Sequence, residues 1–156
     1  MEPVADAAFD LSGRLSARRG AEGVAANFAW DHAPGRDTIE LATPMGTTLA
    51  RLERDAGGAS VRRSDGTVER SRDAATLVER SLGFPLPVES LAWWIRAVPH
   101  PGAPHAIERD ASGRVLVLRQ DGWSVVYAYD DRAARPMRLY ATYPDLEVRI
   151  VIDSWR

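Results

Sequence analysis

The sequence lacks two residue types altogether. It has no cysteine and no lysine, so each of its 20 basic residues is an arginine. Without cysteine the chain forms no disulfide, has no thiol nucleophile and binds no metal through sulfur. It also has no run of about 18 apolar residues, the length that a membrane-spanning helix needs, and no signal-like N-terminal segment. The opening Met1-Glu2-Pro3 is typical of a truncated start.

Charges of the two signs nearly cancel. The formal net charge is -2 over 156 residues, of which 27% are charged and 45% are hydrophobic. This balance gives no electrostatic basis for nucleic-acid binding and is typical of a globular protein. The length indicates a single domain over residues 1–156. Within it, we expect residues 1–8 to form a flexible N-terminal segment.

Catalytic motifs are missing as well. The sequence contains no G-x-S-x-G, no H-E-x-x-H and no phosphate-binding loop. His100 and His105 flank a Pro/Gly loop, whereas a metal site needs closer spacing and a third ligand. His32 stands alone, and Asp130-Asp131 is typical of a turn. We therefore expect a protein that is not an enzyme and that uses no cofactor or metal.

Most of the chain has the alternating pattern of β-strands. In residues 9–15, Phe9, Leu11, Gly13 and Leu15 point to one side and polar residues to the other. Further strand patterns cover residues 24–30, 39–41, 47–53, 115–118, 123–129, 137–142 and 146–155. Turns rich in Gly and Asp separate many of these segments, among them Asp121-Gly122. Alternation with period two and closely spaced turns predicts an antiparallel sheet.

The middle of the chain changes to helical spacing. A first helix is predicted by the apolar residues Ala74, Leu77, Val78 and Leu82. Its N-cap would be Ser71 or Asp73, and Gly83 would end it. A second helix is predicted by the i, i+3, i+4, i+7 stripe of Leu91, Trp94, Ile95 and Val98. Trp93 lies off this stripe, and Pro99 ends the helix. Two helices between groups of strands indicate an α+β fold with the helices on one side of the sheet.

Six local signatures occur in order over residues 9–155. They are Asp10-Leu11-Ser12-Gly13-Arg14-Leu15, Phe28-Ala29-Trp30, Leu41-Ala42-Thr43-Pro44-Met45-Gly46-Thr47, Phe84-Pro85-Leu86-Pro87 with Leu91-Ala92-Trp93-Trp94-Ile95-Arg96-Ala97-Val98-Pro99, Asp121-Gly122-Trp123-Ser124-Val125-Val126-Tyr127, and Arg149-Ile150-Val151-Ile152-Asp153-Ser154-Trp155. In this order and spacing they resemble the LolB family of outer-membrane lipoprotein receptors. The sequence departs from the family pattern in two respects: the lipid-modified N-terminal Cys is absent, and Ala97 stands where many relatives have Gly.

The resemblance implies both a fold and a function. The fold would be an antiparallel sheet curled into an incomplete β-barrel, with a helical lid over a hydrophobic cavity. The function would be that of a monomeric receptor that accepts acylated lipoproteins from the periplasmic carrier LolA. The receptor would insert them into the inner leaflet of the outer membrane, where its full-length form is lipid-anchored on the periplasmic face. Two alternatives stay open: a soluble periplasmic carrier that does not dock on the membrane, and an interaction module whose core is filled.

Apolar positions on the strands and helices would form the cavity wall. The candidates on strands are Phe28, Trp30, Ile39, Leu41, Trp123, Val125, Tyr127, Val148, Ile150 and Ile152. The candidates on helices are Leu77, Val78, Leu82, Leu91, Trp94 and Ile95. An acyl chain offers no hydrogen-bonding group along its length, so such a site needs apolar volume and no catalytic group. For any single residue an ordinary core position explains the pattern as well.

The segment Pro44-Met45-Gly46 predicts a different kind of site. Thr43 and Thr47 flank it, and its turn chemistry indicates an exposed loop. A large apolar side chain at an exposed tip is unfavourable unless it meets an apolar partner. The resemblance implies that Met45 inserts into the membrane or contacts an incoming lipoprotein. The alternative is that Met45 folds back onto the core.

Overall fold

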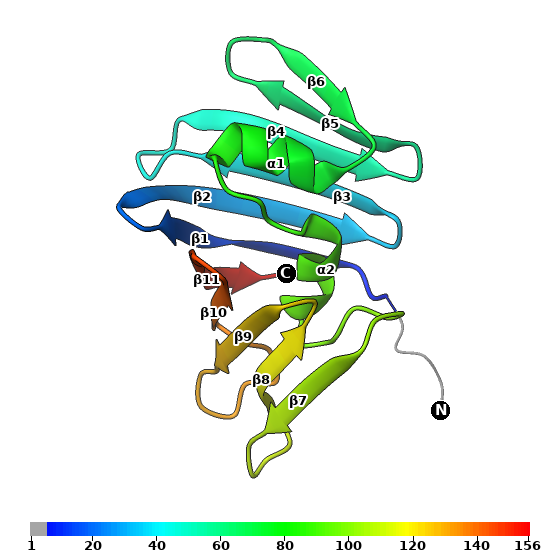
Figure 1. Ribbon diagram of the computed structural model, residues 1–156, viewed down its shortest axis with the longest axis vertical. Coiled ribbons are helices and arrows are strands. Elements are labelled where there is room, and N and C mark those ends of the chain that lie inside the picture. Colours follow the sequence, from blue (N-terminus) through cyan, green and yellow to red (C-terminus); the bar gives the residue numbers. More distant parts are fainter. Residues whose placement is uncertain (1–5) are drawn as a thin grey trace.

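The computed structural model describes residues 6–156, which form one open antiparallel sheet and two short helices (Figure 1). The elements are β1 (Phe9–Arg19), β2 (Glu22–Ala33), β3 (Arg36–Ala42), β4 (Thr48–Asp55), β5 (Gly58–Arg63), β6 (Val68–Ser71), α1 (Ala74–Leu82), α2 (Val88–Trp94), β7 (His105–Arg109), β8 (Val115–Gln120), β9 (Trp123–Ala128), β10 (Arg138–Tyr143) and β11 (Leu146–Trp155). The expected antiparallel sheet is confirmed. Residues 1–5 of the expected flexible segment, with Met1-Glu2-Pro3, lie outside the described residues.

The strand order is β6-β5-β4-β3-β2-β1-β11-β10-β9-β8-β7. The first and last strands of the chain's sheet-forming part, β1 and β11, pair at its centre, and β6 and β7 form its two edges. The sheet is therefore not closed. The helices lie on one face of it, where α1 packs against β4, β5 and β6 (Figure 1). No helix in residues 6–156 has the length and apolar character to cross a membrane.

Alternation along the strands places the core on one face. On β1 the side chains of Phe9, Leu11 and Ala17 are buried, while Arg14 and Arg18 are exposed. The same alternation holds along β2, β3 and β11. Such a pattern follows from the two-residue period of a strand that is covered on one face only.

Gly13 allows β1 to pair closely with β11. The register shifts between Ser12 and Gly13, and a Cβ atom at Gly13 would lie only 2.2 Å from the carbonyl oxygen of Val151. No larger residue fits there without moving the backbone of β11. This position therefore requires glycine, because the backbones of β1 and β11 approach closely here at the centre of the sheet.

The predicted boundaries of α1 are confirmed. Asp73 is the N-cap, because its Oδ1 accepts a hydrogen bond of 3.0 Å from the backbone N–H of Ala75. At the other end Gly83 takes a left-handed conformation, with φ of 86°, and its N–H donates to the carbonyl of Glu79. This is the usual glycine stop of a helix.

The prediction that the second helix runs to Val98 is wrong. Helix α2 ends at Trp94, and the chain then leaves it through a tight turn. The N–H of Ala97 donates to the carbonyl of Trp94, and the N–H of Val98 donates to that of Trp93. This pair of bonds is a Schellman motif, and Ala97 occupies its left-handed position with φ of 60°. Gly is the usual residue at this position. Because Ala stands here instead, nothing in the sequence marked the end of the helix.

Strand β7 was not predicted from the sequence. It is the edge strand paired with β8, and four of its five side chains are exposed. An edge strand that buries neither face has no apolar alternation, so the segment after His105 resembled a loop. His105 is thus the first residue of a strand and not the end of a Pro/Gly loop.

Candidate functional site

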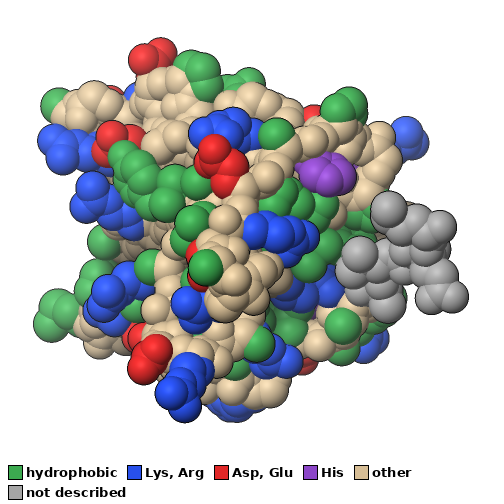
Figure 2. All heavy atoms as spheres, turned by 90° about the horizontal axis from the view of Figure 1, so that it is seen from below, with side chains coloured by type: hydrophobic (Ala, Val, Ile, Leu, Met, Phe, Trp, Pro, Cys, Tyr) green, Lys and Arg blue, Asp and Glu red, His purple; other side chains and the backbone are tan. Residues whose placement is uncertain are grey.

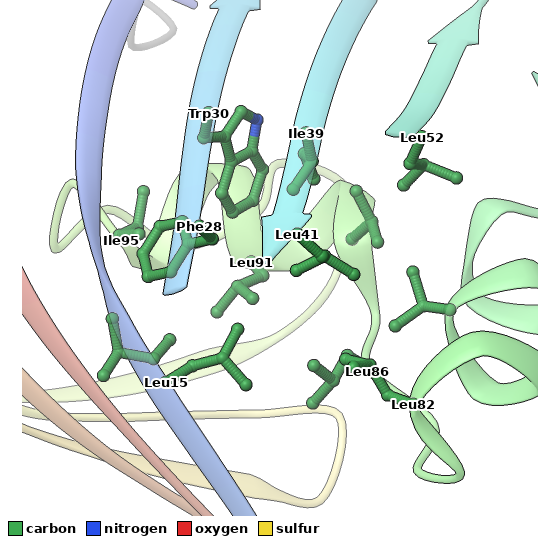
Figure 3. Close-up of a pocket in the computed structure, with 13 residues that line it drawn as sticks. Leu15, Phe28, Trp30, Ile39, Leu41, Leu52, Leu82, Leu86, Leu91 and Ile95 are labelled. Atoms are coloured by element: carbon green, nitrogen blue, oxygen red, sulfur yellow. The ribbon is translucent and has the colours of Figure 1, made fainter. Parts of the chain in front are cut away.

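A small apolar cavity lies between the sheet and the two helices (Figure 3). Its volume is about 40 Å³. The 13 side chains that line it are Leu15, Phe28, Trp30, Ile39, Leu41, Leu52, Val78, Leu82, Leu86, Val88, Leu91, Ile95 and Ile150. Since one water needs roughly 10–15 Å³ on this scale, the space equals only a few waters. The centre of the structure is thus nearly filled.

Many of the predicted cavity residues meet at this cavity. Those that line it are Phe28, Trp30, Ile39, Leu41, Val78, Leu82, Leu91, Ile95 and Ile150. Sequence reasoning missed Leu15, Leu52, Leu86 and Val88. Alternation could have indicated Leu15 and Leu52, since Leu52 pairs with Ile39 across β3 and β4. Leu86 and Val88 lie in and after the proline-rich connector, where no period is visible.

The remaining predicted cavity residues are buried but do not line the cavity. They are Leu77, Trp94, Trp123, Val125, Tyr127, Val148 and Ile152. Around Trp94 the packing is fixed by hydrogen bonds: its Nε1 donates to Gln120 Oε1 at 2.8 Å, and Tyr127 donates to the carbonyl of Trp94 at 2.5 Å. Gln120 Nε2 in turn donates to the carbonyl of His100 at 2.7 Å. Burial raises the pKa of Tyr127, so its hydroxyl remains a donor. We call these three residues, Trp94, Gln120 and Tyr127, the bonded core, together with Trp123, whose ring centroid lies 6.1 Å from that of Trp94.

The loop between β3 and β4 presents Met45 to solvent. The Met45 side chain is 94% exposed. The loop is closed beneath it by bonds of 2.8 Å from Gly46 N–H to the Thr43 carbonyl and from Thr43 N–H to the Thr47 carbonyl. Gly46 has φ of 92°, which only glycine adopts easily. The expected exposure is confirmed, and the alternative that Met45 folds back onto the core is wrong.

The sequence suggested that His32 stands alone, but in the structure it belongs to a cluster of polar side chains. It is 2% exposed and lies opposite Asp37 in the register of β2 and β3. Its Nδ1 is 2.6 Å from Asp37 Oδ1, and its Nε2 is 2.7 Å from Asp6 Oδ1. Asp37 also accepts bonds from Trp30 Nε1 at 2.8 Å and from Arg54 Nε at 2.8 Å. The register of the β2–β3 and β3–β4 hairpins could have predicted that Asp37 lies beside His32 and Arg54.

The protonation states of this cluster follow from its geometry. Ionised carboxylates only accept hydrogen bonds, so both ring nitrogens of His32 donate and the ring is charged. Burial favours the neutral ring, but the bonds to Asp37 and Asp6 outweigh it and raise the pKa of His32. Burial likewise opposes ionisation of Asp37, yet bonds from His32, Trp30 and Arg54 lower the pKa of that carboxyl. The same balance, with bonds from His32 and Arg96, lowers the pKa of Asp6.

Charged side chains of both signs share the surface of the described residues. Arg side chains are spread over the end of the molecule seen in Figure 2 and are not gathered in one basic patch. Several pair with acids, as Arg14 on β1 does with Asp153 on the neighbouring β11 at 3.0 Å and Arg51 with Glu53 of its own strand β4 at 3.1 Å. In residues 6–156 no group of three or more His, Cys, Asp or Glu side chains is placed to hold a metal ion.

Comparison with known proteins identifies the family. The family model described as outer membrane lipoprotein LolB matches residues 7–155. The outer-membrane lipoprotein LolB of Chromobacterium violaceum is 36% identical over 158 residues, a match that covers 100% of this chain and 84% of that relative. The LolB of Thiobacillus denitrificans is 38% identical over 154 residues, covering 99% of this chain and 82% of that relative.

The fold has a solved counterpart. The crystal structure of a LolA superfamily protein from Nitrosomonas europaea superposes with a TM-score of 0.54 at 8% identity, covering 98% of this chain and 87% of that one. At that identity the likeness concerns the fold alone. The family model and the two relatives extend over nearly the whole chain, and the family is one of receptors and not of enzymes. The chain therefore belongs to the LolB family of outer-membrane lipoproteins.

Proposed function

We propose that this protein receives the acyl chains of lipoproteins in the cavity beneath its helices and delivers them to the outer membrane. The observation that carries the proposal is the lining of the cavity, which consists of apolar side chains only (Figure 3). Burying each CH₂ of an acyl chain there is worth about 0.8 kcal/mol. Membership of a family named for outer-membrane lipoproteins supports the same location and cargo.

Acyl binding requires the nearly filled cavity to open. Pockets that hold small ligands have volumes of about 300–1,000 Å³, whereas the cavity measures about 40 Å³. The helices are the parts that can move, because the strands are joined to one another by continuous ladders of hydrogen bonds. Helices α1 and α2 would then act as a lid that separates from the sheet when an acyl chain enters.

Transfer then depends on small differences in affinity. The donor would be the periplasmic carrier LolA, whose superfamily shares this fold. Most of the apolar transfer energy is the same in the donor, in this receptor and in a bilayer, because all three surround the acyl chain with hydrocarbon. The energy needed to open each lid therefore decides which protein holds the lipoprotein.

Delivery would use the loop Pro44-Met45-Gly46. Met45 is the most exposed large hydrophobic side chain among the described residues, and an isolated apolar tip can enter the interface of a bilayer. We place the receptor as a monomer on the periplasmic face of the outer membrane, held in the full-length form by a lipid anchor on a Cys that this sequence does not contain. The loop would contact the inner leaflet while the cavity holds the cargo.

One observation favours a second candidate. A cavity of about 40 Å³ is also what a filled core leaves behind, which fits an interaction module that binds no lipid. A soluble carrier that never docks on a membrane is the other alternative, and the exposure of Met45 argues against it. Uptake of acyl chains separates the module from the receptor, and delivery to membranes separates the carrier from it.

The proposed role of Met45 is tested by Met45→Glu, with Met45→Leu as the matched control. The exposed side chain contributes little to folding, so both variants should change the stability by less than about 0.5 kcal/mol. Purified carrier loaded with lipoprotein, each variant and liposomes are mixed, and the lipoprotein is followed by flotation. We expect the Glu variant to accept lipoprotein and fail to deliver it, because its charge must stay hydrated at the bilayer.

The control should behave like the unchanged protein, since Leu keeps the volume and polarity of Met. Normal delivery by Met45→Glu would remove this residue from the mechanism. Failure already at the acceptance step would place Met45 at the cavity mouth and not at the membrane.

A further inference from the structure

We propose that Arg54 and Glu89 form a latch that keeps the N-terminal end of α2 closed on the sheet and releases when an acyl chain enters the cavity. The latch joins Arg54 Nη1 on β4 to Glu89 Oε1 in the first turn of α2 over 3.2 Å. It is held from behind by Asp37, His32 and Asp6. The proposal rests on the proposed acyl-binding function of the cavity.

The two ends of α2 are fastened differently. At the C-terminal end, Trp94 is buried and bonded to both Gln120 and Tyr127. At the N-terminal end, Pro87 provides no side-chain cap. There the Glu89–Arg54 pair is the ion pair that the described residues of α2 make with the sheet. The helix can therefore turn about Trp94 while its first turn moves away.

Arg54 is fixed before it meets Glu89. Its Nε and Nη2 lie 2.8 and 2.5 Å from Asp37 Oδ2, and its side chain is 16% exposed. A guanidinium already held in this way loses little freedom when it binds a second carboxylate. Glu89 is 67% exposed, so its bond to Arg54 is weaker than the buried bonds between Arg54 and Asp37. Opening would break the contact there and leave the buried pair intact.

Charge balance makes the release reversible. The cluster around His32 contains the cations His32, Arg54 and Arg96 and the anions Asp6, Asp37 and Glu89, drawn from the N-terminal segment, β2, β3, β4, and α2 with the turn after it. When Glu89 leaves, Arg54 keeps Asp37 and Glu89 becomes hydrated. No buried charge loses its last partner, which would be the costly event.

The latch is coupled to the cavity through two elements. Val88 and Leu91 of α2 line the cavity, so movement of the first turn enlarges it directly. Trp30 lines it from β2, with its indole nitrogen turned away from Leu41 (Figure 3) and bonded to Asp37. A ligand that displaces the Trp30 ring therefore pulls on the carboxylate that positions Arg54.

The test measures opening of α2 without any lipoprotein. Hydrogen exchange by mass spectrometry compares the unchanged protein with Glu89→Gln, which keeps the shape and removes the charge. The matched control is Glu79→Gln on the exposed face of α1. Arg54→Lys is a second latch variant, because Lys keeps the charge and loses the forked contact. Uptake of the apolar dye N-phenyl-1-naphthylamine reports access to the cavity.

We expect exchange in residues 88–95 to become about two- to fivefold faster in Glu89→Gln and faster still in Arg54→Lys, with exchange in α1 unchanged. Dye uptake should accelerate in the same order. Exchange in α2 of Glu89→Gln equal to that of Glu79→Gln would overturn the latch, whatever the dye does. Faster exchange in α2 with no dye uptake by any variant would support the latch and contradict the acyl cavity.

Discussion

The helix-covered face of the sheet contains two apolar regions that are held together in different ways. On the β8–β9 side, buried hydrogen bonds of 2.5–2.8 Å join Trp94 to Gln120 and Tyr127 in the bonded core, and the Trp123 ring packs against that of Trp94. On the β1–β4 side, the walls of the cavity meet through apolar contacts, and the hydrogen bonds belong to the cluster around His32, which reaches the wall at Trp30.

This difference decides which region can open. Hydrogen bonds between buried groups are directional, and breaking them leaves unsatisfied donors and acceptors. Apolar contacts are not directional, and an incoming acyl chain can replace them one for one. We therefore expect the cavity side to exchange its contacts for those of a ligand, while the bonded core stays intact and serves as the hinge of α2.

The largest effect should come from a charge placed in the cavity wall. Ile150 is 3% exposed and lines the cavity, whereas Val151 points to the opposite face of β11 and is partly exposed. Ile150→Asp should cost more than about 4 kcal/mol or remove acyl binding, because the carboxylate finds no partner there. Val151→Asp should cost about 1 kcal/mol. Chemical denaturation measures both, and equal costs would contradict the strand phase.

A truncation in the bonded core should come next. Trp94→Ala removes a ring that is 1% exposed and leaves Gln120 without its indole donor. It should cost about 3–5 kcal/mol. Trp93→Ala should cost less, since that ring is only half buried and packs against Arg96 and His100. Thermal melts that show Trp93 as the more damaging site would reverse the orientation of α2.

The smallest effect should be the pH dependence of the stability that the cluster around His32 contributes. The pKa of His32 is raised in the folded state, so its contribution to stability is complete below the ordinary value of 6.5. That contribution disappears as the pH rises through the folded pKa. Asp6 and Asp37 have lowered pKa values, so their contribution is present above 3.8 and is lost on acidification below it.

Stability measured by urea unfolding should therefore decline above pH 6.5. His32→Gln should remove this decline, while His100→Gln, outside the cluster, should keep it. A decline that survives unchanged in His32→Gln would contradict the assignment of the decline to His32.

Alternation and helical spacing predicted the sheet and both helices because each of these elements buries one face. Strand β7 was not predicted because it buries neither face. The end of α2 was placed too late because Ala97 occupies a position where Gly is usual. Both failures concern backbone features that apolar periodicity does not record.

The candidate site was predicted only in part. Periodicity selects residues that face inward, and Leu41 and Tyr127 satisfy it equally. Whether such a residue lines a cavity or a filled core depends on which helix residue packs against it. That packing is set by the direction in which the chain leaves α2 and by hydrogen bonds such as the one from Tyr127 to Trp94. The cluster around His32 needed the register of two hairpins, which bring Asp37 opposite both His32 and Arg54.

The central claim is that acyl chains enter the cavity side and not the bonded core. Photocrosslinking tests it with p-benzoyl-phenylalanine placed at two buried aromatic positions, Phe28 in the cavity wall and Trp123 in the bonded core. Each variant is irradiated with a radiolabelled acylated lipoprotein presented by the carrier. We predict strong labelling from Phe28 and little from Trp123. Equal labelling from both positions, or labelling from Trp123 alone, would contradict the account.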